Sequence, residues 1–302
     1  MGGVIPPLLV TSLTTKELSR LTDVRLKFEK AAHIDSSVLR NTVALIRSDS
    51  TPVTPAEESL FQEGTRLFSR FEGKKAERVK MDTPLTIGKM AYHEGSSSAL
   101  AYASTFVRAS SDEVLAHIWN ANRRGSMYLD EIERSIDEVV SPHNKLIYVR
   151  KQVIKPLEDR DFLSRMLWKQ TTPSNYLHVA ITEENAARPR MRGVVRATFS
   201  SATKIISIGP HMTKLEFVVH PDFQGAVPLW AMKFYIPENL SAISKYQRHF
   251  LSQVPLADMT AEDGRALGEE FLRKKEANNS GVNASERVRA MFKKVRACHT
   301  LV

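Results

Sequence analysis

The sequence is poor in the residues that form disulfides or hold metal ions. Its 302 residues include one cysteine, Cys298, which excludes an internal disulfide and any zinc site built from several thiolates. The nine histidines are scattered, and no two of them flank a glutamate as the ligands of a helical zinc site do. This composition favours a reducing compartment, and it predicts neither a metal nor another cofactor.

Long apolar runs and export signals are also missing. No stretch approaches 18 consecutive apolar residues, so no segment is expected to span a bilayer. The first ten residues include no basic residue, and Pro6 and Pro7 interrupt their apolar stretch, so they do not have the pattern of a signal peptide. The sequence therefore predicts a cytoplasmic protein, with peripheral membrane association as a second expectation.

Signatures of catalysis are absent from the sequence as well. It contains no G-x-S-x-G elbow, no P-loop and no G-x-G-x-x-G after a strand. His178 and His220 lie in predicted strands, where a structural role is the ordinary outcome for a histidine. We therefore expect a protein that is not an enzyme.

What the sequence does have is an excess of basic residues, 43 against 34 acidic ones, for a formal net charge of +9. Such a balance favours a polyanionic partner, either nucleic acid or an anionic membrane surface. The basic residues cluster at Lys74 and Lys75 and again after Ser285. Aromatic residues are not interleaved with these clusters, as stacking on bases would require. We therefore expect no nucleic-acid partner, and we weigh transient contact with an anionic membrane against a plainly solvated basic surface.

Helical signals dominate the first 80 residues. Thr54 and Pro55 have the pattern of an N-cap followed by the first helical position, and apolar residues recur at helical spacing from Leu60 to Phe71. An earlier helix is expected after Thr15. Residues 1–80 are therefore predicted to form a helical N-terminal extension.

From about residue 84 onward, short strand patterns alternate with turns. One helix is predicted among them, where Ser110 and Glu113 fit a capping box. Turn residues recur roughly every 8 to 12 residues, which is typical of an antiparallel meander. The predicted strands are 85–92, 99–108, 135–140, 145–154, 161–169, 176–182, 194–200, 204–208 and 214–220.

Alternation within these strands assigns their side chains to two faces. One face is persistently apolar, as a sheet that covers a core or a cavity requires. Its members include Ile147, Val149, Val153, Phe162, Ser164, Met166, Trp168, Leu215, Phe217 and Val219, with Lys151 interrupting the apolar row.

A long helix is predicted after the last strand, over residues 229–253. Pro228 is suited to open it, and Pro237 is expected either to kink or to divide it. One stripe of this helix holds Met232, Tyr235, Leu240, Ile243, Gln247 and Phe250. Residues 256–302 are predicted to be a basic, partly flexible C-terminal extension.

Two motifs, in this order and spacing, resemble a known family. Asn144-Lys-Leu-Ile-Tyr-Val-Arg-Lys-Gln-Val precedes Asp159-Arg-Asp-Phe162, and the run from Thr213 to Asp222 precedes Phe223-Gln-Gly-Ala-Val-Pro228 and the long helix. Together with Trp119 at the end of the upstream helix, they are similar to the steroidogenic-acute-regulatory-related lipid transfer (START) domain. The resemblance covers roughly residues 84 to 255.

The resemblance implies an α+β helix-grip fold, in which a curved antiparallel sheet wraps around the long C-terminal helix and encloses a tunnel for one lipid or sterol. This domain would span residues 81–255, between the extensions 1–80 and 256–302. The implied function is non-enzymatic lipid binding, used for lipid transfer or lipid sensing. It gives no oligomeric state.

The resemblance also points to the residues that would line the tunnel. Met166 stands where some sterol binders carry arginine, so a polar anchor is sought at Ser164, Lys151 or Gln247. Entry is expected beside the turns 209–210 and 222–227. The expected lipid-binding residues are Ile147, Val149, Lys151, Phe162, Ser164, Met166, Trp168, Phe217, Val219, Met232, Tyr235, Leu240, Ile243 and Gln247.

Two alternatives stay open. Bulky side chains could fill the tunnel and leave an interaction scaffold, a regulatory module of a larger signalling protein. Relatives in the wider superfamily catalyse reactions inside the same cavity, but no matched set of histidine, aspartate and glutamate supports an enzyme here.

Overall fold

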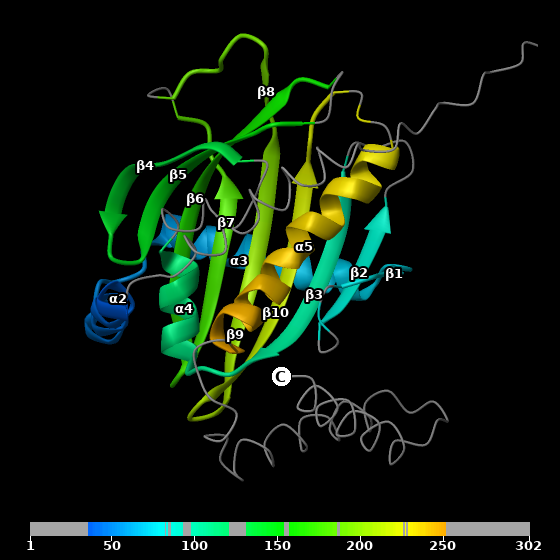
Figure 1. The fold of residues 1–302 in the computed structure, drawn as a ribbon. Helices are drawn as coiled ribbons and strands as arrows, with labels where there is room; N and C mark the ends of the chain where they lie inside the picture. The colour runs from blue at the N-terminus through cyan, green and yellow to red at the C-terminus, as the bar shows by residue number, and fades with distance from the viewer. Residues whose placement is uncertain are drawn as a thin grey trace, which may run out of the picture.

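The structure is a computed structural model, in which one large sheet carries helices on both faces (Figure 1). It describes residues 36–81, 83, 86–92, 98–120, 131–153, 157–185, 188–225, 227 and 229–251. The helix predicted after Thr15 and the C-terminal extension 256–302 lie outside these residues. No helix in the described ranges is long and apolar enough to cross a membrane.

The sheet has the order β1-β2-β3-β10-β9-β7-β6-β5-β4, and β8 pairs in parallel with β6 beside this path. All other strand pairs are antiparallel. After β3 the chain passes through α4 to the far edge at β4, and it then returns through the meander until β10 lies against β3. The strands are β1 (Glu77–Val79), β2 (Ile87–Tyr92), β3 (Ala99–Val107), β4 (Glu131–Ser141), β5 (Asn144–Lys151), β6 (Asp159–Thr172), β7 (Asn175–Thr182), β8 (Val194–Arg196), β9 (Thr198–Gly209) and β10 (Met212–Asp222).

Four helices are described, namely α2 (Ser36–Ser48), α3 (Pro55–Glu72), α4 (Ser111–Trp119) and α5 (Leu229–Leu251). Both predicted N-caps are confirmed. The side chain of Thr54 accepts a hydrogen bond from the amide of Glu57 at 3.2 Å, and both form a complete capping box. Ser110 and Glu113 do the same at the start of α4. Because each cap satisfies backbone N–H groups that a helix start leaves open, the sequence marks these boundaries closely.

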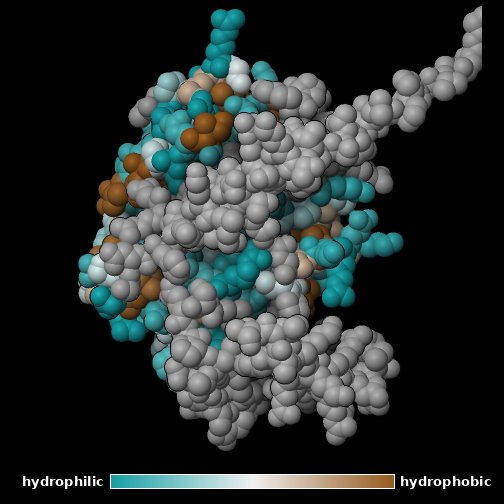
Figure 2. All heavy atoms as spheres, viewed as in Figure 1, coloured by the Kyte–Doolittle hydropathy of each residue, from teal (hydrophilic) through white to brown (hydrophobic). Residues whose placement is uncertain are grey.

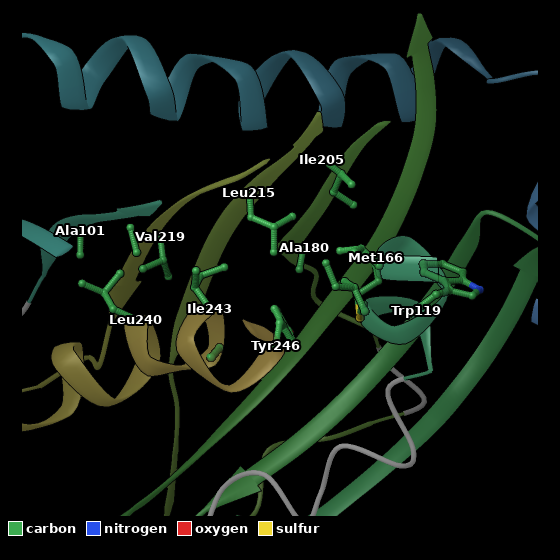
Figure 3. Close-up of a cluster of buried hydrophobic side chains, with 14 of the residues drawn as sticks. Ala101, Trp119, Met166, Ala180, Ile205, Leu215, Val219, Leu240, Ile243 and Tyr246 are labelled. Carbon is green, nitrogen blue, oxygen red and sulfur yellow. The ribbon is translucent and has the colours of Figure 1, made fainter. Parts of the chain in front are cut away.

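Each face of the sheet carries its own apolar layer. On one face, α4 and α5 pack over Met166, Leu215 and Val219, and Figure 3 shows Leu240 and Ile243 of α5 facing this layer. The opposite face is covered by α3, which packs its buried apolar side chains against the sheet. The side chains of this second layer are Phe61, Leu67, Phe68, Phe71, Leu100, Leu167, Leu177, Val179, Ile181, Ala202 and Val218. Alternation therefore predicts correctly which strand side chains lie on the side of α5, but the side chains on the opposite face of the sheet are apolar as well.

Several strand boundaries differ from the prediction, most of all around β9 and at the start of β4. The predicted strand 194–200 is divided at Ala197, whose amide donates to the carbonyl of Asp161 at 2.9 Å, and β9 then runs unbroken from Thr198 to Gly209. It continues through a polar stretch because β7 and β10 hydrogen-bond it from both sides. The first strand of the meander, β4, begins at Glu131, four residues before the predicted start.

Candidate functional site

A cavity of about 160 Å³ lies between the sheet and α5. Its walls come from α4, from strands β4, β5, β6, β7, β9 and β10, and from α5 between Tyr235 and Tyr246. The residues that line it are Ile118, Glu131, Arg134, Ile147, Val149, Lys151, Phe162, Ser164, Met166, His178, Ala180, Phe199, Ser201, Thr203, Phe217, Pro221, Phe223, Tyr235, Glu238, Asn239, Ala242, Ile243 and Tyr246.

Nine of the fourteen residues predicted to contact lipid line this cavity. They are Ile147, Val149, Lys151, Phe162, Ser164, Met166, Phe217, Tyr235 and Ile243. Alternation within β5 and β6 brings the first six to one face, and the stripe of α5 brings Tyr235 and Ile243 opposite them. The cavity therefore lies between the sheet face and the helix stripe that the sequence pattern predicts to face each other.

The other five predicted residues do not line the cavity. Trp168 packs edge-on against Trp119 and Tyr176, and its Nε1 donates to the carbonyl of Pro142 at 3.3 Å. Gln247, proposed as a polar anchor, donates from Nε2 to the carbonyl of Phe106 at 3.1 Å. The remaining three are buried in the core cluster between α5 and the sheet, namely Val219, Met232 and Leu240.

Aromatic rings form part of the cavity wall. Phe162 and Phe199 meet edge to face with ring centroids 6.2 Å apart. Phe223, in the turn between β10 and α5, lies 5.8 Å from the ring of Tyr235. Such pairs stabilise the wall beyond the burial of area alone. The sequence reasoning missed Phe199 and Phe223 because one lies in the divided strand and the other in a turn.

An ion pair adds charge to this mostly apolar wall. Arg134 donates from Nε to Oε2 of Glu131 at 2.9 Å and makes a second contact with the same carboxylate. The two side chains are 13% and 3% exposed. Strict alternation would send residues three apart to opposite faces, but the register shifts between Glu131 and Glu133, and such a bulge resets the alternation. The cross-strand partner of Glu131 is Lys151 at the end of β5.

The Arg-Asp-Phe motif acts beside the cavity. The buried Arg160 donates from Nε to the carbonyl of Phe223 at 2.8 Å and from Nη2 to that of Gln224 at 3.3 Å. Its neighbour Asp161 accepts two hydrogen bonds from Arg196 at 2.9 and 3.0 Å, and both of these side chains are 1% exposed. Burial lowers the pKa of Arg160 from its ordinary value. The motif therefore ties the start of β6 to the turn before α5.

Within the described residues, no group of three or more histidine, cysteine, aspartate or glutamate side chains could hold a metal ion. The arrangement offers an apolar space with a few polar groups, which suits the binding of a hydrophobic molecule with one polar end.

Comparison with solved structures places this arrangement among known folds. The human StAR-related lipid transfer protein 5 matches with a TM-score of 0.54 and 14% identity, over 65% of this chain and 96% of that one. Human STARD10 matches at 0.53 and 14%, over 69% and 85%. The lipid transfer and protein localization domain of human StarD13 matches at 0.50 and 19%, over 66% and 98%. This chain has the START fold.

The START fold confirms the α+β helix-grip class predicted from the sequence motifs. No family model and no curated protein matches the chain. At these identities the structural matches establish the fold, and the ligand has to be argued from the cavity itself.

Proposed function

We propose that this protein binds one lipid or sterol molecule in the cavity between the sheet and α5, and that no covalent bond is made or broken there. The observation that carries the proposal is the mostly apolar lining of that cavity, which the sheet, α4 and α5 supply. Transfer of each ligand methylene from water into such a site is worth about 0.8 kcal/mol. The use we propose for this binding is lipid transfer or lipid sensing.

The polar residues in the cavity wall suit the polar end of such a ligand. Glu131 and Arg134 supply a carboxylate and a guanidinium, and Lys151 and Ser164 also line the cavity. A hydroxyl or carbonyl group of the ligand would hydrogen-bond there, while its hydrocarbon part lies against the phenylalanine rings. The proposed ligand therefore has one small polar head and a larger apolar body.

The size of the cavity favours a second candidate function. Sites for small molecules commonly measure about 300–1,000 Å³, and this one measures about 160 Å³. A whole lipid would enter only if α5 or the turn 222–227 moved outward. If neither moves, the protein is an interaction scaffold whose tunnel its own side chains fill.

Identification of co-purifying lipid tests the proposal directly. The full chain, purified from cells, would be analysed by native mass spectrometry, with solvent extraction of the same sample. One lipid species at one molecule per chain is the expected result. A folded protein that carries no lipid, and takes up none from mixed liposomes, would refute lipid binding and favour the scaffold.

A further inference from the structure

One edge of the sheet carries a surface that the cavity does not explain. Lys74 and Lys75 lie in the connection from α3 to β1, Arg78 and Lys80 follow on β1 and just after it, and Lys89 lies on β2 beside Ile87. We call these six residues the basic face. All six are exposed, Ile87 to 44%. Figure 2, viewed from the side of α5, shows hydrophilic residues along this edge of the molecule, on the right of the view.

Strand register brings two cations of the basic face to one side. Arg78 is directly opposite Lys89, so their side chains share a face of the sheet, and Ile87 shares it because it lies two residues from Lys89. Glu77 and Val79 alternate to the other side, where Val79 is buried in the α5 core. Glu77, the acidic residue of β1, therefore points away from Arg78 and does not neutralise it.

The helix explains some of these cations but not all of them. Lys74 and Lys75 follow the C-terminus of α3, where the helix dipole favours positive charge. The helix dipole does not explain Arg78 and Lys89, which lie on strands. Like charges directly opposite each other on antiparallel strands destabilise the pair. Residues that break a local rule of stability in this way often serve a function.

We propose that the basic face docks the protein on an anionic lipid bilayer. Each cation close to such a surface attracts it, and the exposed Ile87 among them can enter the interface between head groups and acyl chains. Nucleic acid fits less well, because the basic face contains no aromatic ring for stacking on bases. The choice of a membrane accords with the proposed lipid binding, but docking requires no lipid in the cavity.

Sedimentation of the full chain with phosphatidylcholine vesicles, with and without phosphatidylserine, tests this docking. The protein is expected to bind the anionic vesicles and to lose binding as salt is raised. Arg78→Glu with Lys89→Glu should weaken binding about tenfold or more. The matched control is Arg40→Glu with Arg192→Glu, two exposed arginines elsewhere that give the same change in net charge. It should bind within about twofold of the unchanged protein.

Single variants separate docking from folding. Lys89→Glu places opposite charges across the β1–β2 pair, so it should raise the melting temperature while it weakens vesicle binding. Ile87→Ser should weaken binding severalfold and leave its salt dependence unchanged. Equal binding by the Arg78/Lys89 pair variant and its control would overturn the proposal. Stronger binding to duplex DNA, lost in that variant, would overturn the membrane as partner. Vesicle binding by a protein that carries no lipid and takes up none from the vesicles would support docking and refute only the lipid site.

Discussion

Arg160 at the start of β6 donates a hydrogen bond from Nε to the carbonyl oxygen of Phe223, 63 residues further along the chain, at 2.8 Å. Nη2 donates to the carbonyl of the next residue, Gln224, at 3.3 Å. One buried guanidinium thus satisfies the backbone of the turn that leads into α5. Because Phe223 lines the cavity, Arg160 holds this part of the cavity wall against the sheet.

We expect Arg160→Lys to loosen this turn. Lysine lacks the planar fork of donors that reaches several carbonyl groups at once, and loss of hydrogen bonds to a charged donor should lower the free energy of unfolding by about 2 kcal/mol. The protein should then release a bound fluorescent lipid faster, because this turn forms part of the cavity wall. Urea denaturation and a lipid-release assay measure the two effects.

The control for this variant is Arg190→Lys. Arg190 pairs with Glu184 on the surface, where the two side chains are 68% and 64% exposed, so its exchange should change neither quantity. Equal unfolding midpoints for Arg160→Lys and the control would contradict the role of Arg160.

Gly64 allows α3 to lie close against the sheet. A methyl group built at Gly64 would overlap a methyl group of Val179 on β7. Alanine usually stabilises the interior of a helix relative to glycine by about 1 kcal/mol, but here we expect Gly64→Ala to destabilise the protein by about 1–3 kcal/mol. Thermal or urea unfolding measures whether Gly64→Ala raises or lowers the free energy of unfolding.

A second glycine gives the matched control. Gly73, at the C-terminal end of the same helix, has nothing within 4 Å of a built methyl group and a negative φ of −81°. Gly73→Ala should therefore be neutral or slightly stabilising. A gain in stability from both substitutions would show that α3 can move away from β7 without cost.

Local patterns in the sequence predicted the parts of the fold that local physics determines. Thr54 and Ser110 mark helix starts because their side chains bond to amides three residues away. Phe162 and Met166 were assigned to the cavity side because side chains in a strand alternate. Seven of the nine predicted residues that line the cavity follow this strand alternation, and the other two, Tyr235 and Ile243, follow the apolar stripe of α5.

Features that depend on distant residues escaped prediction. The pairing of Glu131 with Arg134 depends on an irregular register with β5, which no spacing within β4 reveals. Arg160 belongs to a motif visible in the sequence, but two of its partners are carbonyl groups 63 and 64 residues away. Trp168 has the right alternation for the cavity, yet the residues around it fill the space it would face.

Acid should weaken the junction between the α2–α3 connection and the sheet. Asp49 accepts a hydrogen bond from the backbone amide of Thr51 at 2.9 Å and contacts Nδ1 of His143 at 2.8 Å. Glu57 accepts from the backbone amide of Thr54 at 2.8 Å and from the side chain of Asn144. Burial alone would raise the pKa of each carboxyl, but these hydrogen bonds outweigh it and hold both pKa values below their ordinary ones.

The sign of the effect follows from these directions. A carboxyl whose pKa is lower in the folded state contributes stability above its unfolded pKa, near 4, and that contribution is lost as the pH falls through the folded pKa. Asp49→Asn and Glu57→Gln should each lower the free energy of unfolding at pH 7 by about 1–2 kcal/mol and flatten its decline below pH 4. Urea titrations across this range measure both. The exposed Glu72→Gln serves as the control, and a decline as steep in the two variants as in this control would contradict the assignment.

Two substitutions in the cavity wall should separate ligand capacity from folding. Met166→Arg places a guanidinium in the apolar part of the cavity, and Ile243→Trp fills it from α5. Both should reduce the uptake of lipid from liposomes more than they reduce stability, because the added atoms occupy space that the native protein leaves open. Ile205→Val is the control, since Ile205 is fully buried on β9 and does not line the cavity. It should cost about 1 kcal/mol of stability and leave uptake unchanged. Normal uptake by both cavity variants would show that lipid binds elsewhere.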